Sequence, residues 1–332
     1  MMGGINGSQT IGIEVKITDR CNQHCFHCAN MDGGYRGRDI DHEQLILRLR
    51  QWHASSDFSR RTIKEIRMTG GEPLLNIRGL LTILAYCKQM GIQSGINTNG
   101  SLLTRSKAKL LKDAGMKVVK ISLDTLDKGL AEKIRGSSAA LENTLRGIRI
   151  AVQTGFDVVI RHTASRLNID QYIPCYEYAR DAGASKFQLK PLIEAGRCKD
   201  NSYMLTFRGL MDIISRLSKV FHGGAPVPEI LCMPPENVFG LPAKACGSIN
   251  KIYISTRGQV FVCNFVTSAP IGSIESETLK DILSRRLLKT PIRAFNGHRV
   301  LENCPHYNRY WEQIYSLNQS KEHTIPTAAD KA

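Results

Sequence analysis

The sequence contains no uninterrupted apolar run that approaches about 18 residues, the length at which a segment becomes a candidate membrane-spanning helix. Its first residues, MMGGINGSQ, are small and polar and lack the apolar stretch of a secretory signal. We therefore expect a cytoplasmic protein that does not associate with membranes. In that compartment the ten cysteines of the chain would be kept reduced or bound to metal.

Aromatic residues are also scarce, at 7 % of the chain, and no RNA-binding motif is present. This weighs against nucleic acid as a partner, although 45 Lys and Arg against 30 Asp and Glu give a formal net charge of +15. The basic residues are spread thinly along the chain. We interpret their excess as solubility with some nonspecific affinity for polyanions.

What the sequence does contain is an alternation of strand-like and helix-like segments. Short apolar runs are separated by amphipathic segments, several of which end in glycine, as helices often do. Such alternation predicts right-handed βαβ units and a parallel sheet. We interpret it as an α/β fold, a partial (β/α)6 TIM-like barrel whose active site lies at the carboxyl ends of the strands. The predicted strands cover residues 11–17, 64–69, 91–99, 117–125, 156–163 and 186–193.

This alternation is predicted to end near residue 200, which divides the chain. We expect the barrel core in residues 1–200, a helix and a Pro/Gly-rich connector in 201–240, and a small extension in 241–319. Within the extension, KIYIS and VFVC flank the turn TRGQ and predict a hairpin. The polar tail, residues 320–332, is expected to be disordered.

Three cysteines, Cys21, Cys25 and Cys28, follow the first predicted strand in the segment CNQHCFHC. Thiolates at these spacings can bind three irons of a cubane iron–sulfur cluster and leave the fourth iron open for chemistry. A zinc site is one alternative, but zinc sites usually pair CxxC with a second pair of ligands. Disulfides are a weaker alternative, because no secretory signal precedes the cysteines.

Gly70, Gly71 and Glu72 end the second predicted strand in the segment MTGGEPLLN. A glycine pair followed by an acid lets a backbone edge and a carboxylate bind a small cationic amine. Together, CxxxCxxC and GGEP resemble the radical S-adenosylmethionine (radical SAM) superfamily. The resemblance implies a SAM-binding [4Fe–4S] cluster, an electron donor of the flavodoxin or ferredoxin type, and reductive cleavage of SAM to a 5′-deoxyadenosyl radical.

The same resemblance implies further contacts with SAM. His27 would pack at the adenine, Gly71 and Glu72 would hold the methionine amine, and Ser122 would reach the ribose. The remaining expected contacts are Gly70, Thr98 and Asn99. The segments IRMTGGEPLLN, TNG and SLD are similar to the GTP-cyclising enzymes of molybdopterin biosynthesis as well. We do not assign that activity, because the chain ends in ADKA rather than Gly-Gly and spaces its later cysteines differently.

A second set of cysteines lies in the predicted hairpin and beyond it. Cys246, Gly258 and Cys263 follow the pattern C-x11-G-x4-C, and Cys304 comes later. This pattern resembles the SPASM and Twitch extensions of radical SAM enzymes, and the cysteine count favours the single-cluster Twitch form. The resemblance implies a second, auxiliary [4Fe–4S] cluster on these three cysteines, whose fourth ligand is Cys232, His306, substrate or solvent. The alternative is three unrelated buried thiols.

Two other cysteines could donate a hydrogen atom to a substrate radical. Cys198 follows the sixth predicted strand near the barrel mouth, and Cys232 lies in the connector. For each, packing in the core is the competing interpretation.

Alternation of side chains along the strands predicts which residues face into the barrel. Polar residues on this face are costly to bury unless they contact a ligand or one another. The resemblance implies that one of the cations there, which we take to be Arg161, binds the SAM carboxylate. The surplus indicates an anionic substrate carrying phosphate or carboxylate. Internal pairing with Asp124 or Glu72, or a register shifted by one residue, would remove that indication. The inward-facing cations are Arg67, Lys120, Arg161 and Lys190.

We therefore expect a radical SAM enzyme of the oxidoreductase, epimerase or lyase type that abstracts hydrogen from a small molecule. Enzymes of this size with one auxiliary cluster often tailor sugars, cyclitols or nucleosides in natural-product biosynthesis, and we favour that class. Two alternatives stay open: modification of a ribosomally made peptide, and a non-catalytic metal-binding module. The second leaves the GGEP segment and the polar barrel face unexplained.

Overall fold

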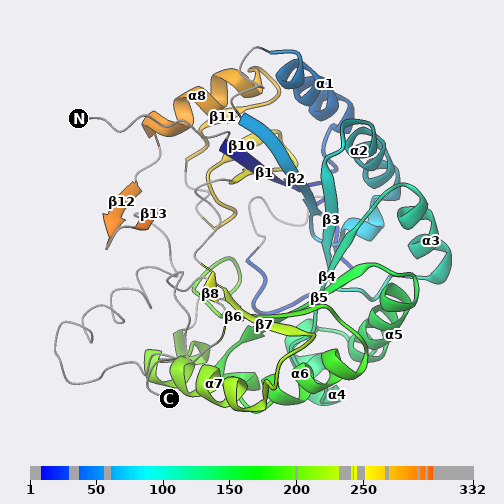
Figure 1. The fold of residues 1–332 in the computed structure, drawn as a ribbon, viewed down its shortest axis with the longest axis vertical. Coiled ribbons are helices and arrows are strands. Elements are labelled where there is room, and N and C mark those ends of the chain that lie inside the picture. The colour runs from blue at the N-terminus through cyan, green and yellow to red at the C-terminus, as the bar shows by residue number, and fades with distance from the viewer. Residues whose placement is uncertain are drawn as a thin grey trace.

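A computed structural model describes residues 9–29, 37–55, 61–198, 201–231, 241, 243–244, 251–265, 269–289, 292–295 and 298–301. In these residues the strands form a curved sheet, and the helices α1 to α7 lie along its outer side (Figure 1). The strands of the main sheet are β1 (Gln9–Lys16), β2 (Arg61–Thr69), β3 (Gln93–Thr98), β4 (Val118–Ser122), β5 (Asp157–Ala164), β6 (Lys186–Pro191), β7 (Val227–Leu231), β8 (Ala243–Lys244), β9 (Lys251–Ile254), β10 (Gln259–Phe261) and β11 (Gly272–Ser273). A separate two-stranded sheet pairs β12 (Ile292–Phe295) with β13 (His298–Leu301).

The helices alternate with the strands as far as β7. Polar side chains fix where several of them begin: Asp41, Asn76, Thr104 and Asp127 each accept a hydrogen bond from a backbone N–H of the first turn. None of the helices in the described ranges combines the length and the apolar character needed to cross a bilayer. The helices are α1 (His42–His53), α2 (Ile77–Met90), α3 (Arg105–Asp113), α4 (Lys128–Arg135), α5 (Ala140–Gln153), α6 (Tyr172–Asp181), α7 (Phe207–Val220) and α8 (Leu279–Lys289), with short 3-10 turns η1 (Pro73–Leu75), η2 (Arg166–Asn168) and η3 (Asn201–Tyr203).

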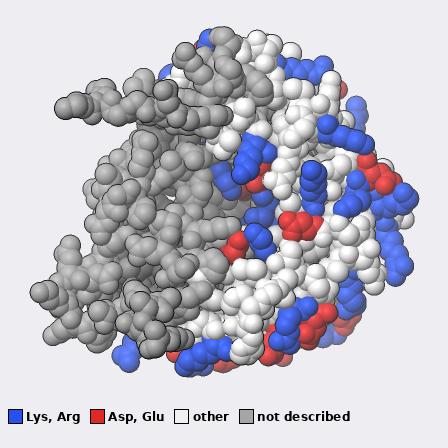
Figure 2. Space-filling model, viewed as in Figure 1, with Lys and Arg blue, Asp and Glu red and all other residues white. Residues whose placement is uncertain are grey.

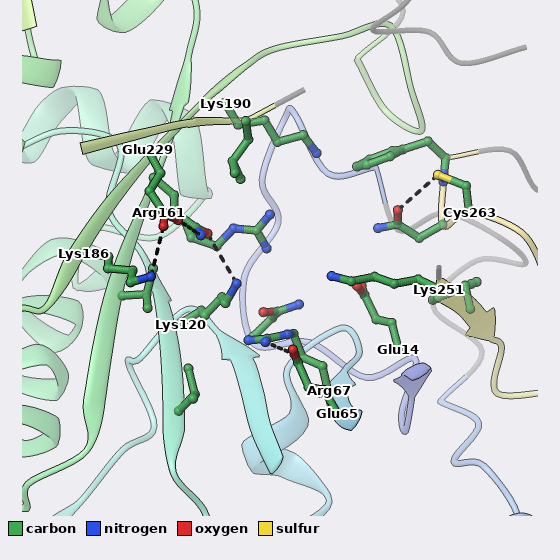
Figure 3. A pocket seen from close by; sticks show the side chains of 18 of the residues that line it. Glu14, Glu65, Arg67, Lys120, Arg161, Lys186, Lys190, Glu229, Lys251 and Cys263 are labelled. Carbon is green, nitrogen blue, oxygen red and sulfur yellow. Dashed lines mark hydrogen bonds and ion pairs between the residues drawn. The ribbon is translucent and has the colours of Figure 1, made fainter. Parts of the chain in front are cut away.

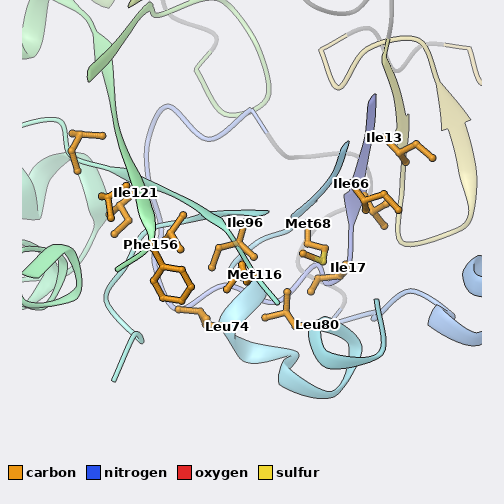
Figure 4. Packing of buried hydrophobic residues seen from close by; sticks show 14 of the residues in the cluster. Ile13, Ile17, Ile66, Met68, Leu74, Leu80, Ile96, Met116, Ile121 and Phe156 are labelled. Carbon is orange, nitrogen blue, oxygen red and sulfur yellow. The ribbon is translucent and has the colours of Figure 1, made fainter. Parts of the chain in front are cut away.

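Strands β1 to β8 lie side by side in chain order, and each pairs with the next in parallel. This arrangement confirms the predicted α/β class and the partial barrel. One face of the strands supplies the core: Ile66, Met68, Ile96 and Ile121 are fully buried among residues such as Leu80 of α2 (Figure 4). The other face of the strands is therefore left for polar residues that point into the barrel.

The sheet is longer at both ends than the sequence predicts. The predicted connector contains β7, which pairs with β6, so the strand–helix alternation does not stop at residue 200. The predicted hairpin is confirmed as the antiparallel pair β9–β10, with Gly258 at a φ of +71° in its turn. Strand β9 also pairs in parallel with β1, which joins the hairpin to the barrel sheet. The predicted domain boundaries are not tested by this continuity and stay predictions, and residues 320–332 lie outside the described ranges.

Candidate active site

Two adjoining cavities open on the inner side of the sheet. The thiol cavity, about 230 Å³, is lined by Cys21, Cys25 and Cys28. The cationic cavity, about 400 Å³, is lined by charged side chains from strands β1, β2, β4 to β7 and β9, and by Gln93 and Asn97 from β3. Both cavities are lined by Arg161 and Lys190, so a bound molecule can extend from one into the other. The residues shared by both are Glu14, Asn97, Arg161, Lys190, Tyr253, Asn264 and Phe265.

Backbone hydrogen bonds hold the three-cysteine segment against its surroundings on both sides of Cys25. The N–H groups of His24 and Phe26 donate to the carbonyls of Arg135 (2.9 Å) and Ile134 (3.1 Å) at the end of α4. Within the described ranges, no three His, Cys, Asp or Glu side chains converge closely enough to hold a single metal ion. A cubane does not require such convergence, because each cysteine binds a different iron. The thiol donors and the cavity beside them therefore fit a cluster.

The glycine pair seats the GGEP segment directly on the chain that leads to Cys21. A Cβ atom on Gly71 would lie 2.2 Å from the carbonyl oxygen of Arg20, and one on Gly70 would lie 2.8 Å from that of Thr18. Any side chain at Gly71 would therefore collide with backbone. The Gly71 amide donates to the Thr18 carbonyl at 2.8 Å, and the Glu72 amide donates to the Arg20 carbonyl at 2.7 Å. The two sequence motifs are thus neighbours in the fold, as their resemblance to one family implies.

Glu72 is fully buried, and its carboxylate joins its own segment to the end of β3. It accepts hydrogen bonds from the Leu74 amide (3.0 Å), the Thr98 hydroxyl (2.7 Å) and the Asn99 amide (2.9 Å). Burial raises the pKa of the Glu72 carboxyl, although these donors oppose the shift. Gly71 lines the thiol cavity, whereas Glu72 is absent from its lining. The contact of Glu72 with a methionine amine stays a prediction.

Of the other residues expected to contact SAM, all but Gly70 line the thiol cavity. His27, Thr98, Asn99, Ser122 and Arg161 all line the thiol cavity, and so does Asn97. Among the described residues, the buried Oδ1 atom of Asn97 has no hydrogen-bond partner, so it offers an acceptor to a bound molecule. The residues predicted from the sequence thus come together from the cysteine segment and from strands β3, β4 and β5, although their individual roles stay predictions.

A buried charge network lies behind the three-cysteine segment. Arg135, the last residue of α4, pairs with Asp124 and also donates from Nη1 to the Cys25 sulfur at 3.8 Å. The Nε2 atom of His27 lies 3.5 Å from Asp124. Burial lowers the pKa of His27 to about 4, so its imidazole is neutral at pH 7. Burial alone would raise the pKa of Asp124, but Arg135 and His27 hold it below its usual range.

The remaining candidate cysteines are spread over different surroundings. Cys198 is 3 % exposed, packs with Leu192 and Met204, and lines neither cavity. Cys263 is also buried, but it lines the cationic cavity and its thiol donates to Asn264 at 3.7 Å. Hydrogen donation by Cys198 and cluster binding by Cys263 stay predictions. Cys232, Cys246 and Cys304 lie outside the described residues.

The four cations predicted to face inward do line the cationic cavity (Figure 3). Burial, together with the neighbouring charges of Arg67 and Arg161, lowers the pKa of Lys120 to about 6. Arg67 pairs with Glu65, but its buried Nη1 atom has no hydrogen-bond partner among the described residues. The cations therefore crowd one another without being fully neutralised. Side chains of both signs gather at the centre of the viewed face in Figure 2.

Glu229 on β7 organises one wall of this cavity. Its carboxylate accepts from Lys186 Nζ at 3.0 Å and from Gln188 Nε2 at 2.8 Å. Because Glu229 takes the amide nitrogen of Gln188, the Oε1 atom of Gln188 turns towards Lys120 Nζ, 3.4 Å away. Glu229 thus fixes the side chain of Gln188, and Gln188 in turn positions the side-chain nitrogen of Lys120.

Sequence reasoning missed two of these residues. Glu229 falls in a Pro/Gly-rich stretch, and only the polar–apolar alternation of VPEIL signals a strand there. Arg135 looks like an ordinary basic residue in the last turn of a helix, where it would complement the helix dipole. The glycine that follows it, Gly136 at a φ of +69°, was a detectable sign of a sharp chain reversal at that point.

Comparison with known proteins gives one consistent result. Residues 15–183 match the family model described as the Radical SAM superfamily. The chain is 32 % identical to the GTP 3′,8-cyclase of Staphylococcus haemolyticus over 77 % of this chain and 78 % of that protein. It is 31 % identical to the GTP 3′,8-cyclase of Acidothermus cellulolyticus over 82 % of this chain and 83 % of that protein.

Solved structures show the same fold at low sequence identity. Streptococcus suis SuiB bound to the precursor peptide SuiA superposes with a TM-score of 0.65 at 15 % identity, covering 83 % of this chain and 64 % of that one. This chain therefore spans less than two thirds of the length of SuiB. The structure of anSMEcpe with bound AdoMet gives a TM-score of 0.63 at 17 % identity, covering 82 % of this chain and 80 % of that one.

Proposed function

Because this chain belongs to the radical SAM superfamily, we propose that it cleaves SAM reductively and abstracts a hydrogen atom from a small anionic molecule held in the cationic cavity. Cys21, Cys25 and Cys28 would hold the [4Fe–4S] cluster, and residues of the thiol cavity would hold SAM. When bound and reduced by one electron, this pair supplies methionine and a 5′-deoxyadenosyl radical. The electron would come from a protein of the flavodoxin or ferredoxin type.

One observation carries the substrate class: the cationic cavity adjoins the thiol cavity and shares Arg161 and Lys190 with it. In the cationic cavity, the Arg67 guanidinium can bind phosphate or carboxylate. A bound anion would also favour the charged form of Lys120, whose pKa is lowered to about 6 without one. A substrate anchored there would present a carbon atom to the thiol cavity. Positioning of this kind is a large part of what an enzyme contributes to a reaction.

Among sugars, cyclitols and nucleosides, we favour a phosphorylated nucleoside. The relatives at 31 and 32 % identity are named as cyclases of GTP, a nucleotide. No comparison supports a place in natural-product biosynthesis. The likeness to the peptide-bound structure concerns the fold alone, and a charged cavity suits a small anion better than a peptide segment.

We further propose a Twitch-like auxiliary [4Fe–4S] cluster on Cys246, Cys263 and Cys304. Its support is the position of Cys263, which lines the cationic cavity at the end of β10. A cluster bound there would face the substrate and could accept the electron left after hydrogen abstraction. That electron transfer would make the net reaction a dehydrogenation.

Anaerobic reconstitution with SAM, a chemical reductant and deuterated nucleotides tests the proposal. We expect release of 5′-deoxyadenosine that carries deuterium from the substrate. Cys25→Ala should abolish SAM cleavage, Cys263→Ala should leave some uncoupled cleavage, and Cys87→Ala, which removes a buried thiol on α2 away from both cavities, should retain full activity. Equal and complete losses in Cys25→Ala and Cys263→Ala protein that still carries iron would contradict this division of roles.

A further inference from the structure

We propose that Arg135 donates a charged hydrogen bond to the Cys25 thiolate and thereby raises the reduction potential of the SAM-binding cluster. The inference concerns how easily the cluster is reduced, and it does not depend on which substrate the enzyme uses. Arg135 would be a tuning residue, because it acts on a ligand of the cluster and not on the substrate.

The guanidinium of Arg135 is fixed from two sides. Its Nη1 atom lies 3.8 Å from the Cys25 sulfur, and its Nη2 atom pairs with Oδ2 of Asp124. The two side chains are 12 % and 2 % exposed. The other oxygen of Asp124 accepts from the Thr163 amide at 2.8 Å, so strand β5 holds the carboxylate in place. The guanidinium therefore cannot turn away from the sulfur without breaking a buried ion pair.

This geometry favours the reduced cluster over the oxidised one. Reduction adds one negative charge to the cluster and its thiolates, and hydrogen bonds to the sulfurs are among the groups that set cluster potentials. A charged donor stabilises the more negative state more strongly, and burial limits the screening of its charge. Because Asp124 contacts Nη2, the Nη1–H group points its positive end at the sulfur. Arg197, the other arginine beside Cys25, donates to its carbonyl oxygen at 3.2 Å.

The backbone around Cys25 is held independently of this side chain. The amides of His24 and Phe26 donate to carbonyls of residues 134 and 135, and these bonds need no guanidinium. A side-chain substitution at Arg135 can therefore remove the contact to sulfur while the cysteine segment keeps its backbone partners.

The experiment is an anaerobic redox titration of the reconstituted full-length protein, followed by electron paramagnetic resonance of the reduced cluster. In Arg135→Gln we expect the equilibrium constant for one-electron reduction to fall at least about tenfold, which corresponds to a potential lower by about 59 mV. Arg135→Lys, which keeps the charge but not the fixed fork, should lie between Arg135→Gln and the unaltered protein. Lys133→Gln removes the same charge from an exposed position on the same helix and should leave the potential unchanged.

An unchanged potential in Arg135→Gln protein with full iron content would overturn the proposal. If that variant binds no iron, the unaltered protein labelled with ¹⁵N-arginine decides the matter. Pulsed resonance of its reduced cluster should then show coupling to an arginine nitrogen that persists in an Arg197→Lys background. Absence of that coupling would equally overturn the proposal.

Discussion

Lys120 lies where the demands of folding and of anion binding conflict. It projects from β4 into the cationic cavity, where burial and the charges of Arg67, Arg161 and Lys251 together lower its pKa to about 6. An unfolded chain would hold this group near its ordinary pKa of 10.5. Between about pH 6 and 10.5 the unfolded state therefore binds more protons at this site, and the protein loses stability as the pH falls through that window.

Lys120→Met should relieve this cost. At pH 7 we expect the variant without metal or SAM to melt about 3 °C or more above the unaltered protein. The difference should shrink as the pH rises towards 10.5, because the unfolded chain then begins to lose the Lys120 proton as well. Melting curves recorded anaerobically from pH 6.5 to 9.5 measure this. Lys117→Met, which changes an exposed lysine just before the same strand, serves as the control, and an equal shift there would refute the explanation.

Single residues also mark the limit of what the sequence could predict about the site. The glycine pair and the cysteine spacing indicated a functional site, because folding alone rarely requires such patterns. Alternation of side chains along β4 and β6 placed Lys120 and Lys190 correctly in the barrel. By contrast, the anchoring of Arg135 by Asp124 joins α4 to the end of β4. Nothing in local composition specifies that contact, because it follows from how the helix packs.

Elements with strong periodicity were predictable, and those that depend on distant partners were not. Strands β1 to β6 and the helices between them follow from apolar patterns that each segment carries alone. Strand β7 was missed because prolines and glycines dominate the segment around it. The hairpin was predicted, but its pairing with β1 joins residues more than 230 positions apart, as in Ile13 with Ile252. Such pairing depends on the sheet edge left open by the barrel.

The hairpin turn offers a test of the proposed auxiliary cluster. Gly258 has a φ of +71°, and a Cβ atom there would lie 3.0 Å from side-chain atoms of Ile274 and Glu275. Gly258→Val should strain the turn and displace Cys263, at a cost of about 1–3 kcal/mol. We expect bound iron to fall from about eight to about four per chain, since each cubane holds four.

The matched control for this variant is Gly91→Val. Gly91 has a nearly equal φ of +66° at the end of α2, but a Cβ atom there would meet nothing within 4 Å. It should therefore keep about eight irons despite similar backbone strain. Four irons in the unaltered protein would remove the auxiliary cluster altogether and leave the SAM-binding cluster in place.

At the scale of the whole molecule, positive charge is present both over the general surface and in the cationic cavity, and anion binding to each can be distinguished. The chain carries a formal net charge of +15, which attracts any polyanion to its surface. The cationic cavity concentrates Arg67, Lys120, Arg161 and Lys190 in a partly buried volume, with Lys186 and Lys251 beside them. Attraction to the surface is screened within about 10 Å at 0.1 M salt, whereas buried pairs are screened much less.

Pyrophosphate should therefore stabilise the protein through the cavity. At a concentration of about one hundred times its dissociation constant, a ligand of the folded state adds about 2.7 kcal/mol to the free energy of unfolding. We expect the rise in melting temperature to persist when KCl is raised to about 0.3 M, where the screening length is short. Arg67→Gln should abolish most of the rise, because its Nη1 atom, which has no hydrogen-bond partner in the described part of the chain, is a donor that the anion would use. Arg105→Gln, at an exposed position on α3, should leave the rise intact.

A rise that vanishes in salt and is equally weakened by both substitutions would show that pyrophosphate binds the general surface charge. The anionic substrate would then lose its structural support.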